Sequence, residues 1–121
     1  MTISEVSEKF GLTPDTLRYY ERIGLIPPVP RTRSGLRDYD ESSCNWIEFI
    51  KCMRGAGLQI EVLIEYVALY QQGDSTIEAR KNLLIEQRKD LLQKQAEIAA
   101  TIDRLNYKID NYEKICAKVI K

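Results

Sequence analysis

Residues 16–28 read TLRYYERIGLIPP, and this stretch decides how the rest of the chain is interpreted. Immediately before it, Thr13 offers an N-cap and Pro14 suits the first position of a helix. Gly24, within the stretch, is a frequent helix terminator. We therefore predict a helix over about 14–23 that runs directly into an extended segment.

The predicted helix has two chemically different faces. Leu17, Tyr20 and Ile23 recur at near-helical spacing and are expected to face a core. The side chains left outside are Asp15, Arg18, Tyr19 and Arg22. Arginine can bind guanine or phosphate through paired hydrogen bonds, and tyrosine can donate one to a phosphate oxygen. The outward face therefore suits contact with DNA.

A second short helix is predicted on the N-terminal side. Thr2-Ile3-Ser4-Glu5 matches the capping-box pattern, and Gly11 is a natural stop, so we expect a helix over about 3–10. Only about three residues then separate the two helices. Two short helices joined by a tight turn form a helix-turn-helix, in which the second helix enters the major groove.

A wing is predicted on the C-terminal side of the recognition helix. The proline-dense run 25–30 cannot be helical, and Ser34-Gly35 is a credible hairpin turn. We therefore expect a small β-hairpin over about 25–39. It carries three arginines: Arg31, Arg33 and Arg37.

Two further helices complete the predicted head, residues 1–72. Asp40 should cap a helix over about 41–54, which Gly55 ends, and another should cover about 60–72 after Gln59, a poor cap. Apolar residues at helical spacing predict a core stripe on each helix. The stripes comprise Trp46, Phe49, Ile50 and Met53 on the first helix, and Val62, Leu63, Tyr66, Val67 and Tyr70 on the second.

After a predicted linker over 73–76, one long helix is expected over 77–121. It contains no glycine or proline, and apolar residues recur every seven positions, which is typical of a coiled coil. The expected dimer-interface residues are Leu84, Leu91, Ile98, Ile102, Leu105 and Ile109. So long an amphipathic helix needs a partner helix, but the periodicity leaves parallel and antiparallel pairing open.

Composition excludes several functional classes. The net charge is zero, yet five arginines and one acid, Glu21, occupy the segment from Arg18 to Arg37, which indicates an anion-binding face. No run resembles a signal peptide or a membrane span, so a cytoplasmic protein is expected. Three widely spaced cysteines do not suggest a disulfide framework. Because histidine is absent, Ser-His and Cys-His nucleophile systems are excluded, and an enzyme is not expected.

The order of these features resembles the MerR family of transcription regulators. The resemblance rests on TLRYYE at 16–21, GLIPP at 24–28, GLRDY at 35–39, GAGL at 55–58 and the long terminal helix. It implies an all-α fold with a β-hairpin wing, in which a winged helix-turn-helix head precedes an antiparallel coiled coil in a homodimer. It also implies binding to double-stranded promoter DNA and activation by distorting the spacer, so that RNA polymerase engages both promoter elements.

Several site residues follow from this resemblance. It assigns DNA contacts to the recognition helix, to the wing and to one position near the backbone: Arg18, Tyr19, Tyr20, Arg31, Arg37 and Arg54. Leu36 departs from the aromatic residue often found in the wing, which puts a contact there in doubt. Metal sensing needs several soft ligands that converge, and this chain offers only Ser75 at the start of the terminal helix and a lone Cys116 near its end, so no metal or other cofactor is expected.

The effector is predicted to act through a thiol. The run KCMRGAGL at 51–58 resembles the NmlR/AdhR branch, which responds to aldehydes and other electrophiles through a cysteine here, Cys52. Lys51 and Arg54 are expected to favour its thiolate form. Cys44 is the second candidate. Two alternatives stay open: a MerR-like regulator without thiol sensing, constitutive or controlled by a small ligand, and a coiled-coil adaptor for another protein.

Overall fold

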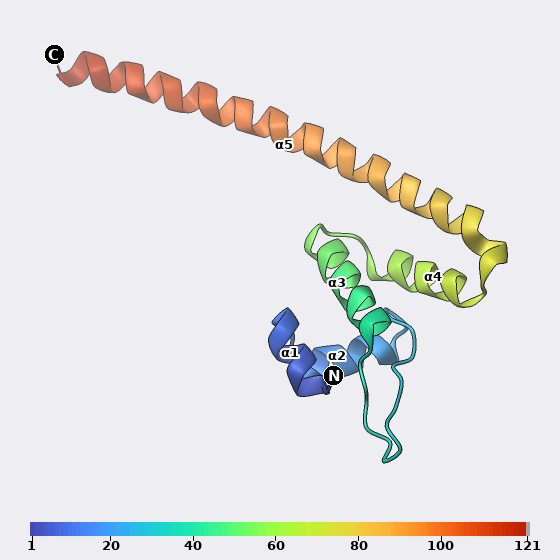
Figure 1. The fold of residues 1–121 in the computed structure, drawn as a ribbon. Coiled ribbons are helices and arrows are strands. Elements are labelled where there is room, and N and C mark those ends of the chain that lie inside the picture. The colour runs from blue at the N-terminus through green and yellow to red at the C-terminus, as the bar shows by residue number, and fades with distance from the viewer. Residues whose placement is uncertain (121) are drawn as a thin grey trace. The chain divides into compact units, whose positions relative to one another are not determined.

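The computed structural model describes residues 1–120, which form helices joined by turns and, between the second and third helices, by a long loop (Figure 1). In chain order the elements are α1 (Ile3–Phe10), α2 (Pro14–Arg22), α3 (Glu41–Gly55), α4 (Ile60–Gln71), the 3-10 helix η1 (Asp74–Thr76) and α5 (Ile77–Ile120). The chain divides into two compact units: the head, Met1–Leu84, and the tail, which is the rest of α5 from Ile85.

Local capping determines where the first helices begin and end. The predicted capping box of α1 is confirmed, because Glu5 N–H donates to Thr2 Oγ1 at 3.2 Å and Thr2 N–H donates to Glu5 Oε1 at 2.9 Å. Gly11 ends α1 in the left-handed conformation with φ 66°. Asp40 caps α3, since its Oδ1 accepts from Ser43 N–H at 2.8 Å. The predicted weakness of Gln59 is also confirmed, because α4 has no side-chain cap.

The predicted β-hairpin wing is wrong. Residues 25–39 form a basic loop, and within residues 1–120 the backbone pairing is limited to one isolated antiparallel bridge between Arg31 and Arg37. Thr32 N–H donates to Leu36 O and Asp38 N–H donates to Pro30 O, each at 2.7 Å, so the loop folds back on itself. The pairing stops there because the proline-dense run 27–30 lacks most of the N–H donors that a ladder needs.

The core of the head corrects the predicted stripe on α3. Ile47 and Ile50 are fully buried, whereas Trp46 and Phe49 are half-buried. The two aromatic rings instead join a cluster with α4, in which the ring centroid of Trp46 lies 5.8 Å from that of Tyr66. The buried apolar side chains are Val6, Leu17, Tyr20, Leu25, Ile26, Val29, Tyr39, Cys44, Ile47, Ile50, Leu58, Leu63 and Val67.

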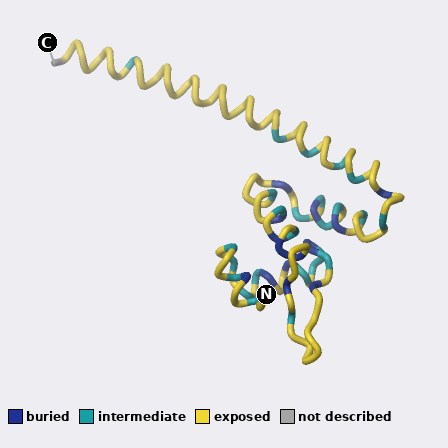
Figure 2. The backbone as a smooth tube through the Cα atoms, viewed as in Figure 1, coloured by how far each residue is buried: buried dark blue, intermediate teal, exposed yellow. Residues whose placement is uncertain are grey.

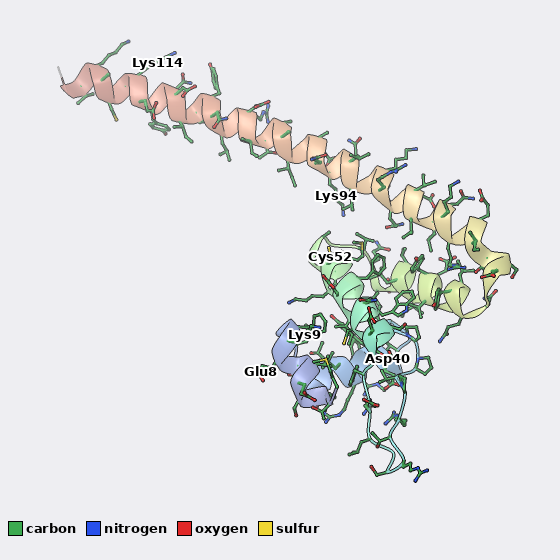
Figure 3. The ribbon with its side chains drawn as sticks, in the orientation of Figure 1. Glu8, Lys9, Asp40, Cys52, Lys94 and Lys114 are labelled. Carbon is green, nitrogen blue, oxygen red and sulfur yellow. The ribbon has the colours of Figure 1, made fainter. Side chains whose placement is uncertain are left out.

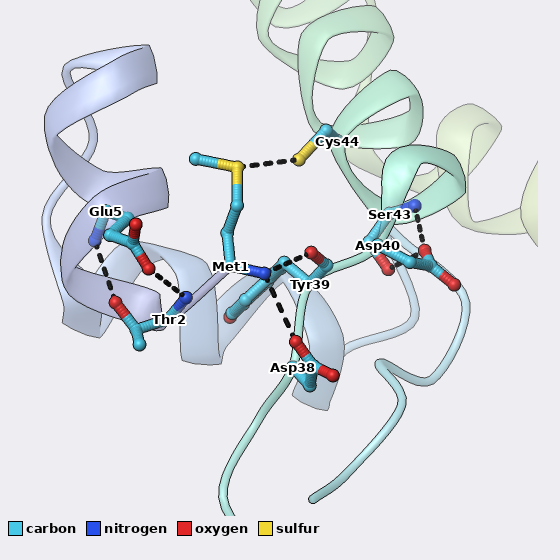
Figure 4. A network of polar contacts seen from close by, with 8 residues as sticks. All are labelled: Met1, Thr2, Glu5, Asp38, Tyr39, Asp40, Ser43 and Cys44. Carbon is cyan, nitrogen blue, oxygen red and sulfur yellow. Dashed lines mark hydrogen bonds and ion pairs between the residues drawn. The ribbon is translucent and has the colours of Figure 1, made fainter.

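Backbone contacts from Met1 connect the start of α1 to the segment that enters α3 (Figure 4). The Met1 nitrogen donates to Tyr39 O at 2.7 Å and to Asp38 Oδ1 at 3.2 Å, while Tyr39 N–H donates to Met1 O at 2.8 Å. The Met1 sulfur lies 4.0 Å from Cys44 Sγ. These contacts hold the C-terminal end of the basic loop against the helix-turn-helix.

Thr76 fixes the turn between α4 and α5. Its hydroxyl donates to Leu69 O at 2.6 Å and accepts from Arg80 Nε at 3.1 Å. Gly73 adopts φ 90°, a conformation that disfavours other residues. The first turns of α5 are therefore anchored to the head.

The tail is one continuous helix whose side chains are almost all exposed (Figure 2). Its exposed apolar residues include Ile98, Ile102, Leu105 and Ile109, at 50–61% exposure. Apolar surface of this extent on an isolated helix is unfavourable in water. No helix in the described chain combines the length and apolar character needed to cross a membrane.

Candidate nucleic-acid interface

The outer face of α2 presents the predicted recognition side chains. Arg18 and Tyr19 are exposed, and Arg22 is also exposed, with its guanidinium over the Tyr19 ring, 5.4 Å from the centroid. Arg18 donates to Asp15 Oδ1 at 3.0 Å, but Asp15 is 95% exposed. Such a surface pair is weak, so Arg18 is readily available to another anion.

Tyr20 lies on the opposite face of α2. It is 9% exposed and belongs to the core, and this burial raises the pKa of its phenol, with nearby Arg54 opposing the increase. Arg54 itself donates from Nη1 to Leu58 O at 2.7 Å. These two residues, both predicted to contact DNA, therefore have partners within the head.

Glu21 organises the basic loop. Its Oε1 accepts from Arg37 Nε at 2.7 Å and lies 3.6 Å from Arg31 Nη2, and its Oε2 accepts from Val29 N–H at 2.7 Å. Burial alone raises the pKa of this carboxyl, but the hydrogen bonds from Val29 and Arg37 and the two guanidinium charges lower it below its usual value overall. From the sequence alone, Glu21 stands out only as the single acid among the arginines of this segment.

The predicted arginines converge on one hollow. The hollow has a volume of about 330 Å³, and its lining residues come from the start of α1, from α2 and from the basic loop: Thr2, Ile3, Arg18, Arg31, Gly35, Leu36 and Arg37. Three guanidinium groups around one concavity favour an anion the size of phosphate. The sequence did not predict that Thr2 and Ile3 line this hollow, because no pattern in it links the start of α1 to the loop.

Tyr39 lies in the field of the same arginines. The residue is 1% exposed, and its hydroxyl has no hydrogen-bond partner among the residues that the structure describes. Burial raises the pKa of the phenol, while the charges of Arg37, Arg18 and Arg31 lower it and that of Glu21 raises it. The phenol therefore stays neutral at physiological pH and fills space behind the charged groups.

The three cysteines differ in access. Cys52 lies near the C-terminal end of α3 (Figure 3). Cys52 and Cys116 are exposed, whereas Cys44 is buried. The two cations predicted to activate Cys52 are engaged elsewhere: Lys51 Nζ donates to Phe10 O, and Arg54 donates to Leu58 O. Within the described residues, no cluster of three or more metal-binding side chains occurs.

Comparisons with known proteins agree with this arrangement. The family model described as "MerR HTH family regulatory protein" matches residues 1–69, and the one described as "MerR, DNA binding" matches residues 45–107. The chain is 62% identical over 93 residues to the HTH-type transcriptional regulator AdhR of Bacillus subtilis; the match covers 77% of this chain and 66% of AdhR.

Solved structures show the same fold. A MerR family regulator from Listeria monocytogenes is 50% identical, with a TM-score of 0.91 over 93% of this chain and 86% of that one. HiNmlR, a MerR family regulator lacking the sensor domain and solved bound to promoter DNA, is 31% identical, with a TM-score of 0.85 over 96% of this chain and 92% of that one. The chain therefore belongs to the MerR family of helix-turn-helix transcription regulators; it is a DNA-binding regulator and not an enzyme.

Proposed function

We propose that this regulator binds its promoter as a homodimer, distorts the spacer and activates transcription in response to reactive aldehydes and other electrophiles. The observation that carries the DNA part is the convergence of Arg18, Arg31 and Arg37 around one hollow beside the exposed face of α2. The HiNmlR structure supports the same use of this fold, since that protein was solved on promoter DNA.

Pairing through α5 is supported by its exposed apolar row. The six predicted interface residues are half-buried or exposed within a single chain: Leu84, Leu91, Ile98, Ile102, Leu105 and Ile109. A partner helix packed along the tail removes this surface from water, which stabilises the pair by about 25 cal/mol for each Å² of apolar area buried. The pairing proposed is an antiparallel coiled coil, as the family resemblance implies.

Activation is proposed to act through DNA shape. Two heads at a separation set by the paired α5 helices contact both halves of an operator, and bending or untwisting the spacer between them brings both promoter elements into reach of RNA polymerase. In this mechanism, binding of the regulator to its operator is not enough to activate transcription. The sensing event must change the distortion of the DNA.

Cys52 is the proposed sensor because its thiol is exposed on the head, whereas Cys44 is buried. The thiolate sulfur adds to the carbonyl carbon of an aldehyde, and the carbonyl oxygen takes up a proton, which gives a hemithioacetal. An adduct on α3 sits two residues from Arg54, which bonds to the turn before α4. That turn is the proposed route by which the adduct changes the head.

The deciding experiment is in vitro transcription from the regulator's own promoter, with and without an aldehyde. Cys52→Ser should abolish the response and leave basal DNA binding intact, whereas Cys116→Ser, the matched control at an exposed thiol, should respond like the parent. An unchanged response in Cys52→Ser rejects the sensor assignment. Loss of response in Cys116→Ser instead assigns sensing to the tail.

A regulator controlled by a small ligand rather than by a thiol is the second candidate. It is favoured by the engagement of Lys51 and Arg54 with carbonyl oxygens and by an open, mainly aromatic pocket of about 290 Å³ on the head. The pocket is lined by Ser42, Asn45, Trp46, Phe49 and Tyr66. Mass spectrometry after mild electrophile exposure separates the two, because only thiol sensing requires an adduct on Cys52.

A further inference from the structure

The two loop arginines that face Glu21 are held very differently. Arg37 Nε lies 2.7 Å from the carboxylate, and the Arg37 side chain is 24% exposed. Arg31 Nη2 lies 3.6 Å from the same oxygen, and its side chain is 46% exposed. The Arg37 contact is a short charge-assisted hydrogen bond, whereas the Arg31 separation exceeds hydrogen-bond distance.

The carboxylate also fixes the backbone of the basic loop. Oε2 accepts from Val29 N–H at 2.7 Å on the incoming side, while Oε1 binds Arg37 on the outgoing side. Glu21 is 12% exposed, so both bonds are largely shielded from water. One side chain of α2 therefore connects the recognition helix to both ends of the loop.

Arg31 keeps most of its donors free. Within the described residues, its one direct hydrogen bond is from Nη1 to Gly35 O at 3.3 Å, near the long limit for such a bond. The guanidinium lines the hollow that also contains Arg18. A phosphate entering the hollow can take the Arg31 donors without breaking a short bond.

From this asymmetry we propose that Glu21 and Arg37 are positioning residues, which together support the loop, and that Arg31 is the loop arginine that neutralises a DNA phosphate. This inference rests on the DNA binding argued above and refines it. Arg37, one of the predicted DNA contacts, therefore affects DNA binding only by holding the loop in place and does not itself contact the nucleic acid.

The proposal has a measurable electrostatic consequence. Each phosphate that a protein neutralises on double-stranded DNA contributes about −0.9 to the slope of the logarithm of the binding constant against the logarithm of salt concentration. Loss of Arg31 should reduce the magnitude of that slope by about 0.9. Between 50 and 200 mM salt, the factor by which the DNA-binding constant falls should therefore be roughly threefold to fourfold smaller for the variant than for the parent.

The test measures binding to the regulator's own promoter over a series of salt concentrations. Arg31→Gln should reduce the slope by about 0.9, and Arg31→Lys should restore it, because a lysine also neutralises a phosphate. Lys94→Gln, which removes one exposed tail cation, is the charge control and should leave the slope unchanged. A parent slope near zero would instead reject DNA binding through phosphates altogether.

Arg37 is tested in protein that already carries Arg31→Gln. In the parent, Arg37→Gln could displace the loop and so change the slope indirectly, through loss of the Arg31 contact with phosphate. Adding Arg37→Gln in this background should leave the slope unchanged. A further drop of about 0.9 overturns the proposal, because it shows that Arg37 neutralises a phosphate of its own.

A double-mutant cycle tests the support role directly. Glu21→Gln and Arg37→Gln should each weaken DNA binding in the otherwise unaltered protein, and the combined variant should bind no more weakly than the worse single one. Circular dichroism of each variant checks that the helices remain. Additive losses contradict a shared support and reject the assignment.

Discussion

Replacing Glu21 with glutamine should destabilise the head in a way that depends on pH. The variant keeps the shape of the side chain and one carbonyl oxygen, which can still accept from Val29 N–H. It loses the negative charge opposite Arg37 and Arg31. The change therefore isolates the ionic part of the interaction.

The magnitude follows from the geometry. A hydrogen bond to a charged group contributes about 1.5–3 kcal/mol, and the 2.7 Å bond between Glu21 and Arg37 is mostly shielded, with exposures of 12% and 24%. We expect a loss of about 2 kcal/mol at pH 7. In urea this lowers the unfolding midpoint by roughly 1 M.

The pH dependence has a definite sign. The folded-state pKa of Glu21 lies below its ordinary value of 4.5, so its charge stabilises the head fully above that pH, and the stabilisation disappears as the pH falls through the folded-state pKa. The other groups facing the carboxylate are the guanidinium groups of Arg37 and Arg31 and the Tyr39 phenol, so Glu21 is the carboxyl of this cluster.

The assay is urea unfolding of parent and variant at equal protein concentration, from pH 7 down to the lowest pH at which both still fold. The two curves should be well separated at pH 7 and should converge on acidification. A difference that stays constant with pH refutes the reasoning, as does a variant as stable as the parent at pH 7. Asp15→Asn, which removes an exposed carboxylate from the same helix, is the control and should change little.

Three further outcomes follow from the described contacts. Leu17→Ala, at a fully buried position of α2, should cost about 2–5 kcal/mol by chemical denaturation, and a loss below about 1 kcal/mol contradicts its place in the core. Tyr39→Phe removes a buried hydroxyl without a partner, so stability should hold or rise by about 1 kcal/mol, whereas a clear loss implies an unrecognised hydrogen bond. Iodoacetamide, followed by peptide mass spectrometry, should label Cys52 in the native protein and Cys44 only after unfolding; native labelling of Cys44 contradicts its burial.

Helix ends were predictable because caps are local. The hydrogen bonds between Thr2 and Glu5 and between Asp40 and Ser43 join residues three positions apart. A short sequence pattern is therefore enough to predict each of these bonds. The left-handed conformation at Gly11 follows from the same local chemistry. The outward face of α2 was predictable as well, because one helical period determines both of its sides.

Periodicity was less reliable for α3. Helical spacing identifies an apolar stripe but does not say which part of it the neighbouring elements cover. Of the predicted stripe, Ile50 is fully buried as expected, but Trp46 and Phe49 are only half-buried, and the other fully buried position, Ile47, was not predicted. The aromatic rings pack on one another and on α4 at the edge of the core instead.

By itself, the sequence determined the helix-turn-helix, the family and the segment in which the basic residues lie, because each depends on the identity and spacing of near neighbours. Only the tertiary structure decided that residues 25–39 form a loop rather than a β-hairpin, because the N–H donor that the prolines leave in the run 27–30, that of Val29, bonds to Glu21 of α2. It alone also placed Glu21 beside Arg37, sixteen positions away. A contact over that distance exists only after the chain has folded, and it makes one of two similar arginines a support and leaves the other free.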